Sequence, residues 1–350
     1  EGWTMAGILE RYAGLLPLND STPRITLGEG STPLLALPRL GGALGVELYV
    51  KVEGMNPTGS FKDRGMVLAV SKALENGARA VVCASTGNTS ASAAAYAAAA
   101  GIPCFVLLPA GHVARGKLAQ AMALGARVLA VRGNFDQALD LAVRASEEMG
   151  LTLVNSLNPY RLWGQRTAAW EVADSLGKAP DWLAIPVGNA GNITAYWTGF
   201  VQYRNLGKTV SVPRMMGFQA EGACPLVKGH VVENPETVAT AIRIGRPVSG
   251  AKAAAAARMT GGGFHSVADG EILEAQHRLA STEGVFAEPA SCAPIAGLFK
   301  LKREGGLPAG IRVACVLTGN GLKDTETATK SLPSPLEIEG TWPTIREALS

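Results

Sequence analysis

Residues 56–65, Asn-Pro-Thr-Gly-Ser-Phe-Lys-Asp-Arg-Gly, place Lys62 at the entrance of a helix directly after a turn. Residues 48–52 have the composition of a strand, and residues 66–74 carry the apolar spacing of a helix. The Asn-Pro and Thr-Gly pairs indicate the turn, and Ser60 is a candidate helix cap. The positive field of a helix N-terminus lowers the pKa of an amine, and a neutral amine can form a Schiff base. The segment therefore predicts a strand, a turn and a helix that carries a reactive lysine; the alternative is an exposed lysine at a helix entrance.

The rest of the chain alternates strand-like and helix-like segments. Strands are expected at 80–84, 103–108, 127–131, 151–154, 182–187, 214–218 and 312–317. Helices are expected at 88–100, 114–124, 135–149, 161–176, 192–206, 269–282 and 292–304. Repeated β–α units of this length predict a parallel sheet covered by helices. The 350 residues are enough for two lobes, so we expect a two-lobed α/β protein.

Composition argues against several classes of protein. Lys and Arg (32) and Asp and Glu (29) are interspersed, and aromatic residues make up only 6%, so no nucleic-acid surface is expected. Charges interrupt every apolar run before it reaches membrane-spanning length, and no membrane partner is expected. The five cysteines are odd in number and widely spaced, which favours reduced thiols and a cytoplasmic protein. The four histidines lack metal-ligand spacing, and no metal is expected.

The N-terminal residues 1–5 have neither a basic region nor an apolar core, so they do not resemble a signal peptide. Met5 is a candidate for the native start of the chain.

Ligands of open α/β sheets bind where strands end and helices begin. Residues 84–90, Ala-Ser-Thr-Gly-Asn-Thr-Ser, offer hydroxyls and backbone N–H groups to an anion such as a carboxylate; the alternative is a well-capped helix. Residues 186–192, Pro-Val-Gly-Asn-Ala-Gly-Asn, predict a phosphate cradle before a helix, or else an ordinary tight turn. The third glycine of the dinucleotide fingerprint is missing there.

Two further turns carry candidate ligand-binding residues. Thr318, in the segment 317–323, would stand at the sheet edge, where its hydroxyl could meet a ring nitrogen; a plain turn is the alternative. Arg161 ends the polar segment 154–161 at a helix entrance and suits a doubly charged phosphate; a surface loop is the alternative. Four such turns around one lysine suggest pyridoxal phosphate, whose phosphate, ring nitrogen and aldehyde need these partners.

The same segments, together with 239–245 and 288–291, resemble the threonine synthase family in register from Gly28 to Asp324. The resemblance implies an α/β enzyme of the fold type II class, which depends on pyridoxal 5′-phosphate. It implies two lobes, each with a central, mostly parallel sheet flanked by helices. Residues 1–54 and 160–350 would form a large cofactor-binding lobe, and residues 55–159 a small mobile lobe. Homodimers are common for this fold.

The resemblance also implies roles for individual residues. Lys62 would bind the cofactor covalently and then move protons, Asn88 would bond its 3′-oxygen, and Thr318 would face its ring nitrogen. The cofactor phosphate would be held by Gly188, Asn189, Ala190, Gly191 and Asn192. Ser85, Thr86 and Thr89 would bind the substrate carboxylate, and Ser156, Arg161 and Asn189 the substrate phosphate, with Asn155 also among the substrate-binding residues.

The reaction implied is γ-elimination of phosphate from O-phospho-L-homoserine, followed by β-addition of water to give L-threonine. We hypothesise that the liberated phosphate helps to activate that water.

The chain departs from the family at two places. Trp163 stands where a glutamate is expected, and residues 248–250, Val-Ser-Gly, replace Ala-Ser-Trp before an alanine-rich run to Ala257. These changes leave the cofactor positions intact and bear on the substrate. Two alternatives therefore stay open beside a threonine synthase. One is a paralogue that performs β- or γ-replacement on a related phospho-amino acid or serves as an inhibitor-resistant duplicate in a specialised pathway. The other is a non-catalytic binding protein, against which Lys62 argues.

Overall fold

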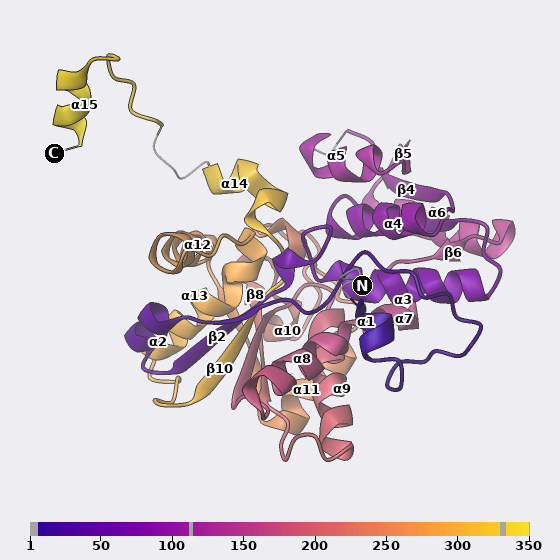
Figure 1. Cartoon of the computed structure of the whole chain (residues 1–350), viewed down its shortest axis with the longest axis horizontal. Helices are drawn as coiled ribbons and strands as arrows, with labels where there is room; N and C mark the ends of the chain where they lie inside the picture. The colour runs from indigo at the N-terminus through magenta and orange to yellow at the C-terminus, as the bar shows by residue number, and fades with distance from the viewer. Residues whose placement is uncertain (1–5, 112–114, 330–333, 350) are drawn as a thin grey trace, which may run out of the picture.

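Two separate sheets organise the chain into two lobes, in the computed structural model that describes residues 6–111, 115–329 and 334–349 (Figure 1). Met5, the candidate start, lies outside the described residues. The six-stranded sheet has the order β1(Leu34–Ala36), β2(Glu47–Val52), β10(Arg312–Leu317), β7(Trp182–Pro186), β8(Arg214–Ala220) and β9(Gly263–Val267). The four-stranded sheet has the order β5(Arg127–Val131), β4(Cys104–Pro109), β3(Val81–Ala84) and β6(Thr152–Leu153).

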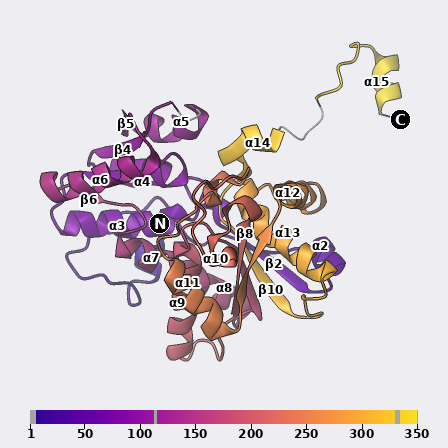
Figure 2. The same ribbon diagram turned by 180° about the vertical axis from the view of Figure 1, so that it is seen from behind.

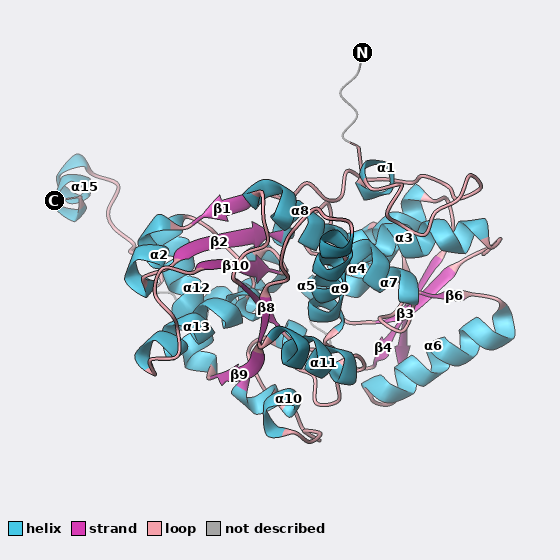
Figure 3. Ribbon diagram, turned by 90° about the horizontal axis from the view of Figure 1, so that it is seen from below, coloured by secondary structure: helices cyan, strands magenta, loops and turns pink. Residues whose placement is uncertain are grey.

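All strand pairs in both sheets are parallel except β1 with β2. Strands β7 and β10 of the large lobe and β3 of the small lobe are almost wholly apolar and buried, as strands covered on both faces must be. Figure 3 shows the two groups of strands side by side, each flanked by helices. The predicted α/β class and the two mostly parallel sheets are therefore confirmed.

Helices cover each sheet. The four-stranded sheet carries α3(Lys62–Glu75), α4(Asn88–Ala99), α5(Arg115–Ala123) and α6(Phe135–Met149). Around the six-stranded sheet lie α2(Pro38–Leu44), α7(Pro159–Gln165), α8(Thr167–Leu176), α9(Gly191–Asn205), α11(Gly250–Thr260), α12(Asp269–Glu283) and α13(Pro289–Arg303). The short helical segments are α1(Ile8–Arg11), η1(Glu53–Met55), η2(Glu221–Ala223), α10(Pro225–Lys228), η3(Thr240–Ile242), η4(Gly321–Asp324), α14(Thr325–Thr329) and α15(Trp342–Ala348). Seen from behind, α15 stands away from both lobes (Figure 2).

The structure corrects the prediction of one helix over residues 161–176. The segment forms two helices, α7 and α8, that meet at Arg166. The Thr167 hydroxyl bonds the Gly164 carbonyl oxygen at 2.7 Å and so competes with the backbone ladder at the junction. The alanine-rich run after Gly250, for which we predicted no element, forms α11 because alanine favours a helix and fits closely packed surfaces.

The two lobes come closest where α3 crosses α7. A Cβ atom at Gly164 would lie 1.9 Å from the Arg64 carbonyl oxygen, and a Cβ atom at Gly65 would lie 2.5 Å from the Arg161 carbonyl oxygen. Only glycine at both positions lets the two backbones approach so closely. This crossing fixes the distance between the helix that carries Lys62 and the helix that carries Arg161.

Candidate active site

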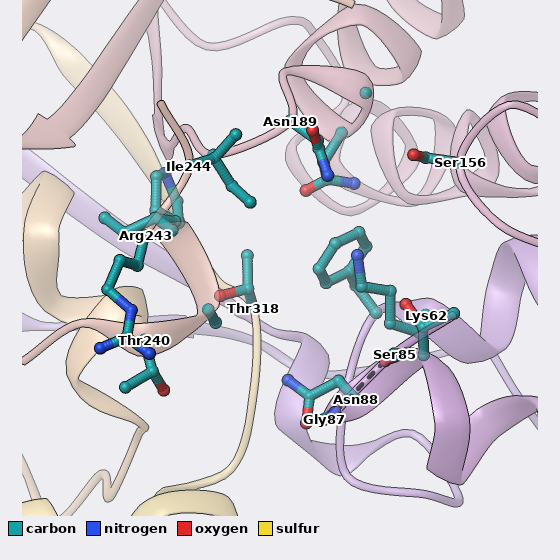
Figure 4. A pocket seen from close by; sticks show the side chains of 18 of the residues that line it. Lys62, Ser85, Gly87, Asn88, Ser156, Asn189, Thr240, Arg243, Ile244 and Thr318 are labelled. Carbon is teal, nitrogen blue, oxygen red and sulfur yellow. Dashed lines mark hydrogen bonds between the residues drawn. The ribbon is translucent and has the colours of Figure 1, made fainter. Parts of the chain in front are cut away.

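All the candidate cofactor-binding and substrate-binding residues predicted from the sequence line one cavity between the two lobes. Its volume is about 390 Å³, within the range of small-molecule sites. The cavity wall includes Lys62, Ser85, Thr86, Asn88, Thr89, Asn155, Ser156, Arg161, Gly188, Asn189, Ala190, Gly191, Asn192 and Thr318. Figure 4 shows Lys62, Asn88, Asn189 and Thr318 around the same space, although they come from four different turns.

Lys62 is the first residue of α3, and the backbone ahead of it is tied to the end of β10. The Phe61 N–H donates to the Thr318 carbonyl oxygen at 3.0 Å, and Ser60 forms an isolated bridge with Gly319. Burial lowers the pKa of the Lys62 amine to about 7, helped by the positive charge of Arg161 and opposed by Glu288. The lowered pKa thus has burial and Arg161 as its main causes, where we expected the helix N-terminus.

The turn before Lys62 is closed by Asp63. Its carboxylate accepts from the Thr58 backbone N–H at 2.7 Å and from the Thr58 hydroxyl at 2.6 Å. Ser60, the candidate cap, only reaches the Lys62 N–H at 3.4 Å, and Gly59 takes the positive φ of 85° that the turn requires. The turn is therefore held by a carboxylate inside the helix rather than by a hydroxyl in front of it.

A network of buried ion pairs around Arg64 holds the first turn of α3. Arg64, which is fully buried, bonds Glu53 at 2.6 Å and Glu171 at 2.6 Å. Lys51 of β2 bonds the same Glu171 at 2.6 Å, so two cations and two carboxylates compensate one another. Removing one member of such a network costs about 3–5 kcal/mol, because a charge is left buried and unpaired. The network ties α3 to β2 and α8, and thereby limits the movement of Lys62.

The predicted phosphate cradle is the turn between β7 and α9. Ala190 adopts a left-handed conformation with φ of 62°, which is uncommon for a residue with a side chain. A Cβ atom at Gly188 would lie 3.0 Å from the Cα of Ile242, so a side chain there would crowd η3 where it crosses the turn. Asn192 donates to the Gln165 side-chain oxygen at 3.0 Å, while its own Oδ1 is buried without a hydrogen-bond partner. The turn thus presents the N-terminus of a 15-residue helix to the cavity.

The hydroxyl-rich turn before α4 is organised by Ser85. Its Oγ accepts from the backbone N–H groups of Gly87 at 3.2 Å and Ser90 at 3.3 Å, and Figure 4 marks the first of these bonds. A Cβ atom at Gly87 would meet no atom within 4 Å, so this glycine borders open space. Because the Ser85 oxygen is occupied as an acceptor, its hydroxyl hydrogen can point toward a ligand.

Asn155 holds the start of this turn. Its side-chain oxygen accepts from the Ala84 N–H at 2.8 Å, and its side-chain amide donates to the Ala84 carbonyl oxygen at 2.8 Å. Both polar ends of the amide are therefore engaged with the end of β3, although Asn155 lines the cavity.

Arg161 lies deeper in the wall and is 2% exposed. One of its terminal nitrogens donates to the Val154 carbonyl oxygen, and its Nε is buried without a hydrogen-bond partner. Burial lowers the pKa of Arg161 to about 10, which still leaves the guanidinium charged at neutral pH. A buried cation with an unsatisfied donor is suited to an anionic ligand.

The sequence analysis assigned no role to Glu288, which the structure places beside Thr318. Its carboxylate accepts from the Asn88 side-chain amide at 3.2 Å and from the Thr318 hydroxyl at 3.4 Å. Ser291 fixes Thr318 from the other side, with 2.9 Å between the two hydroxyl oxygens. The segment 288–291 belonged to the resemblance, but nothing in its sequence indicated which residues it would meet.

Two other parts of the wall were also missed. Residues 240–244, Thr-Ala-Ile-Arg-Ile, form one side of the cavity, and Figure 4 shows Thr240, Arg243 and Ile244 opposite Lys62. Lys323 lines the wall and donates to the Thr58 carbonyl oxygen at 3.0 Å and to the Gln120 side chain at 2.5 Å. It thereby connects η4 to the loop before Lys62 and to α5 of the other lobe.

The two departures from the family pattern do not line the cavity. Trp163 is half-buried beside the core, and the guanidinium of Arg166 stacks on its ring at 3.6 Å. Val248 and Ser249 meet Asn189 through their backbone N–H groups, at 3.4 Å and 3.0 Å. Because these contacts use the backbone, they do not depend on the side chains that differ.

The residues of the cavity fit pyridoxal phosphate. Three features define a place for a phosphate. They are the unpartnered oxygen of Asn192, the close approach of Gly188 to Ile242, and the N-terminus of α9. A lysine whose pKa is about 7 stands opposite a threonine hydroxyl at the end of a strand. Within the ranges that the structure describes, no group of three or more His, Cys, Asp or Glu side chains could hold a metal ion. Fold and site together define a pyridoxal-phosphate enzyme of the α/β type.

Comparison with known proteins agrees with this class and narrows it. The model of the family of pyridoxal-phosphate dependent enzymes matches residues 25–319. A threonine synthase of Synechocystis sp. is 59% identical over 327 residues, which cover 93% of this chain and 85% of the relative. A threonine synthase of Mycobacterium tuberculosis is 55% identical over 329 residues, 94% of this chain and 91% of the relative. The chain belongs to the threonine synthase family of pyridoxal-phosphate dependent enzymes.

Solved structures of lower sequence identity show the same fold. The processed form of threonine deaminase isoform 2 from Solanum lycopersicum superimposes with a TM-score of 0.73 at 24% identity, covering 85% of this chain and 82% of that chain. O-ureido-L-serine synthase superimposes with a TM-score of 0.75 at 21% identity, covering 88% of this chain and 95% of that chain. The predicted fold type II architecture is confirmed.

Proposed function

We propose that this protein is a threonine synthase that converts O-phospho-L-homoserine and water to L-threonine and phosphate. One observation carries the proposal: a single cavity contains Lys62, whose pKa is lowered to about 7, and the buried cation Arg161. The same cavity has two separate places for an anion, at the N-termini of α9 and α4. The relatives named above, at 55–59% identity over most of the chain, carry that name.

The substrate has two anionic ends, and the cavity offers a different chemistry to each. Ser85, Thr86 and Thr89 would hold the carboxylate through hydroxyls and the first turn of α4. Arg161, Ser156 and Asn189 would hold the phosphate, which becomes a leaving group only if cations and N–H donors stabilise its charge. Asn155 would bind the substrate as the resemblance implies, and it also supports the first of these sites through Ala84.

The cofactor would be held by Lys62, Asn88, the turn Gly188, Asn189, Ala190, Gly191 and Asn192, and Thr318. When bound, pyridoxal phosphate supplies an electron sink for negative charge that develops on the substrate carbons. Lys62 would accept the protons that leave Cα and then Cβ, because its pKa of about 7 lets it act as a base near neutral pH. Thr318 would face the ring nitrogen with its hydroxyl, which does not transfer a full proton.

The direct test measures phosphate and threonine together. The purified protein, loaded with pyridoxal phosphate, is given O-phospho-L-homoserine, with Lys62→Ala as the blank. Equal amounts of the two products are expected. Phosphate without threonine would instead support a paralogue with another replacement reaction, and a colourless protein that takes up no cofactor would contradict every enzymatic reading.

We further propose that residues 55–159 move as a lobe during the reaction. Two contacts in the cavity support this: Asn88 reaches Glu288, and Gln120 reaches Lys323, so each joins the small lobe to the large one. Opening these two contacts would expose the cavity to solvent, as in other enzymes that close on a substrate. A smaller radius of gyration in solution scattering when substrate analogue is added would support the movement.

We propose a cytoplasmic homodimer for the working enzyme. Five buried cysteines with free thiols suit a reducing compartment, and no described helix is long and apolar enough to cross a bilayer. The dimer rests on analogy with the fold, and light scattering would test it.

A further inference from the structure

Glu288 occupies the place in the cavity where the two lobes meet. It is the residue before α13 and is only 5% exposed. Its carboxylate accepts from the Asn88 side-chain amide at 3.2 and 3.4 Å, and from the Thr318 hydroxyl at 3.4 Å. Asn88 begins α4 of the small lobe, whereas Thr318 follows β10 of the large lobe. One carboxylate therefore connects two residues that the chain separates by 230 positions.

The backbone around Glu288 keeps that carboxylate in place. The Glu288 N–H donates to the Gly319 carbonyl oxygen at 3.1 Å, and Ala287 forms an isolated bridge with Asn320. A Cβ atom at Gly319 would lie 2.5 Å from a carboxylate oxygen of Glu288, so the carboxylate packs directly over a glycine. A side chain at position 319 would displace the carboxylate from this position, so the glycine leaves room for it.

We propose that Glu288 is a positioning residue that aligns Asn88 and Thr318 with each other across the boundary between the lobes. The proposal rests on the proposed function, in which Asn88 would contact the 3′-oxygen of the cofactor and Thr318 its ring nitrogen. Glu288 acts through its two partners and exchanges no proton with the substrate.

The surroundings of Glu288 favour its role as an acceptor. Its carboxyl oxygens accept the hydrogen bonds from Asn88 and Thr318, and the ionised form offers these donors the most lone pairs. Burial raises its pKa, and Asn88, Lys323, Thr318 and Lys62 oppose that rise. The charged groups that face it are Lys62 from α3 and Lys323 from η4, with the Cys292 thiol of α13 as the remaining titratable neighbour. The two lysines favour the ionised form, against the effect of burial.

The test measures how tightly the full-length protein, freed of cofactor, binds pyridoxal phosphate, by the change in absorbance on titration. Glu288→Ala is expected to weaken binding about tenfold or more, since two hydrogen bonds to a charged group are lost. Glu288→Gln keeps the shape and one acceptor oxygen and should fall between wild type and Glu288→Ala. Glu304→Ala, at the exposed far end of the same helix, is the matched control and should bind like wild type.

A double-variant cycle separates positioning from general support of the fold. If Glu288 acts through Asn88, then Asn88→Ala and Glu288→Ala together should weaken binding clearly less than the product of their separate effects. The absorbance of the bound cofactor should also change its pH dependence in Glu288→Gln, which a purely structural residue would leave unaltered.

Full additivity in that cycle, or wild-type affinity in both Glu288 variants, would overturn the proposal. If Glu288→Ala does not fold, Glu288→Gln decides alone: unchanged affinity and pH dependence count against the proposal. Absence of cofactor binding by wild type would instead overturn the proposed function.

Discussion

Asn155 pairs with Ala84 as if it extended a strand. Its side-chain oxygen and amide make the two hydrogen bonds, both 2.8 Å, that a neighbouring backbone would make to the end of β3. The turn that begins at Ser85 therefore starts from a fixed point, even though β6 ends two residues before Asn155. The Asn155 side chain thus makes the last pair of hydrogen bonds at this end of β3.

Replacing Asn155 by alanine should loosen that turn. The N–H and carbonyl of Ala84 would both lose their partner, at a cost of about 1–3 kcal/mol in the free energy of unfolding. We expect the KM for the phospho-amino acid to rise more than kcat falls if the turn binds the substrate carboxylate, as proposed above. Steady-state kinetics and urea denaturation measure the two effects. The same substitution at exposed Asn205 is the control, and a lower kcat at unchanged KM would contradict this explanation.

Gly164→Ala should separate α3 from α7. The new Cβ atom would lie 1.9 Å from the Arg64 carbonyl oxygen, so the helices must move apart and Lys62 must move relative to Arg161. We expect a loss of about 1–3 kcal/mol in unfolding free energy, as in other overpacked cores, and weaker cofactor binding.

Gly42→Ala in α2 is the matched control for Gly164→Ala, since its Cβ atom would meet nothing within 4 Å. It should leave stability unchanged or raise it by up to about 1 kcal/mol. Thermal unfolding of both variants measures the difference, and equal effects would show that the helix crossing is not tight.

The lowered pKa of Lys62 makes the stability of the cofactor-free protein depend on pH. Between its folded pKa of about 7 and its ordinary value of 10.5, the unfolded chain binds a proton that the folded chain does not. The free energy of unfolding therefore rises with pH between about 7 and 10.5. Below pH 7 the folded protein carries the full cost of burying the charged amine. Lys62→Met removes the cost, so it should stabilise the cofactor-free protein most at pH 6 and least above pH 10.

Urea denaturation at several pH values measures the gain from Lys62→Met. Lys178→Met is the control, because that ammonium lies in water in the folded protein as well. A gain that did not shrink as the pH rises would mean that Lys62 is not the group responsible.

Trp163→Glu should leave substrate choice unchanged. Trp163 lies outside the cavity and stacks on Arg166, whose Nε is buried without a partner. A glutamate at position 163, three residues before Arg166, could form an ion pair with the same guanidinium. Tryptophan and glutamate would then each interact with Arg166. We expect kcat/KM for O-phospho-L-homoserine to change less than about threefold, with a stability change of about 1 kcal/mol from the lost cation–π contact. A change of preferred substrate would revive the interpretation of this chain as a paralogue.

Sequence alone determined the order of the elements and the chemistry of the turns. The apolar runs of β7, β10 and β3 are long and uninterrupted, and each is followed by glycine and small polar residues, which local rules read well. For the same reason Lys62, Asn88, the turn 188–192 and Thr318 could be named in advance: each lies between the end of a strand and the start of the next helix or at that start, where parallel sheets bind ligands.

Only the tertiary structure decided which side chains meet. Glu288 follows no strand of the large sheet, yet its carboxylate lies between Asn88 and Thr318. The contact of the Asn155 amide with Ala84 was not predictable from the sequence, and the lowered pKa of Lys62 has burial and Arg161 as its causes rather than its place in the helix. Burial, charge proximity and hydrogen-bond partners depend on distances between segments that are remote in sequence, and local patterns of residues do not carry those distances.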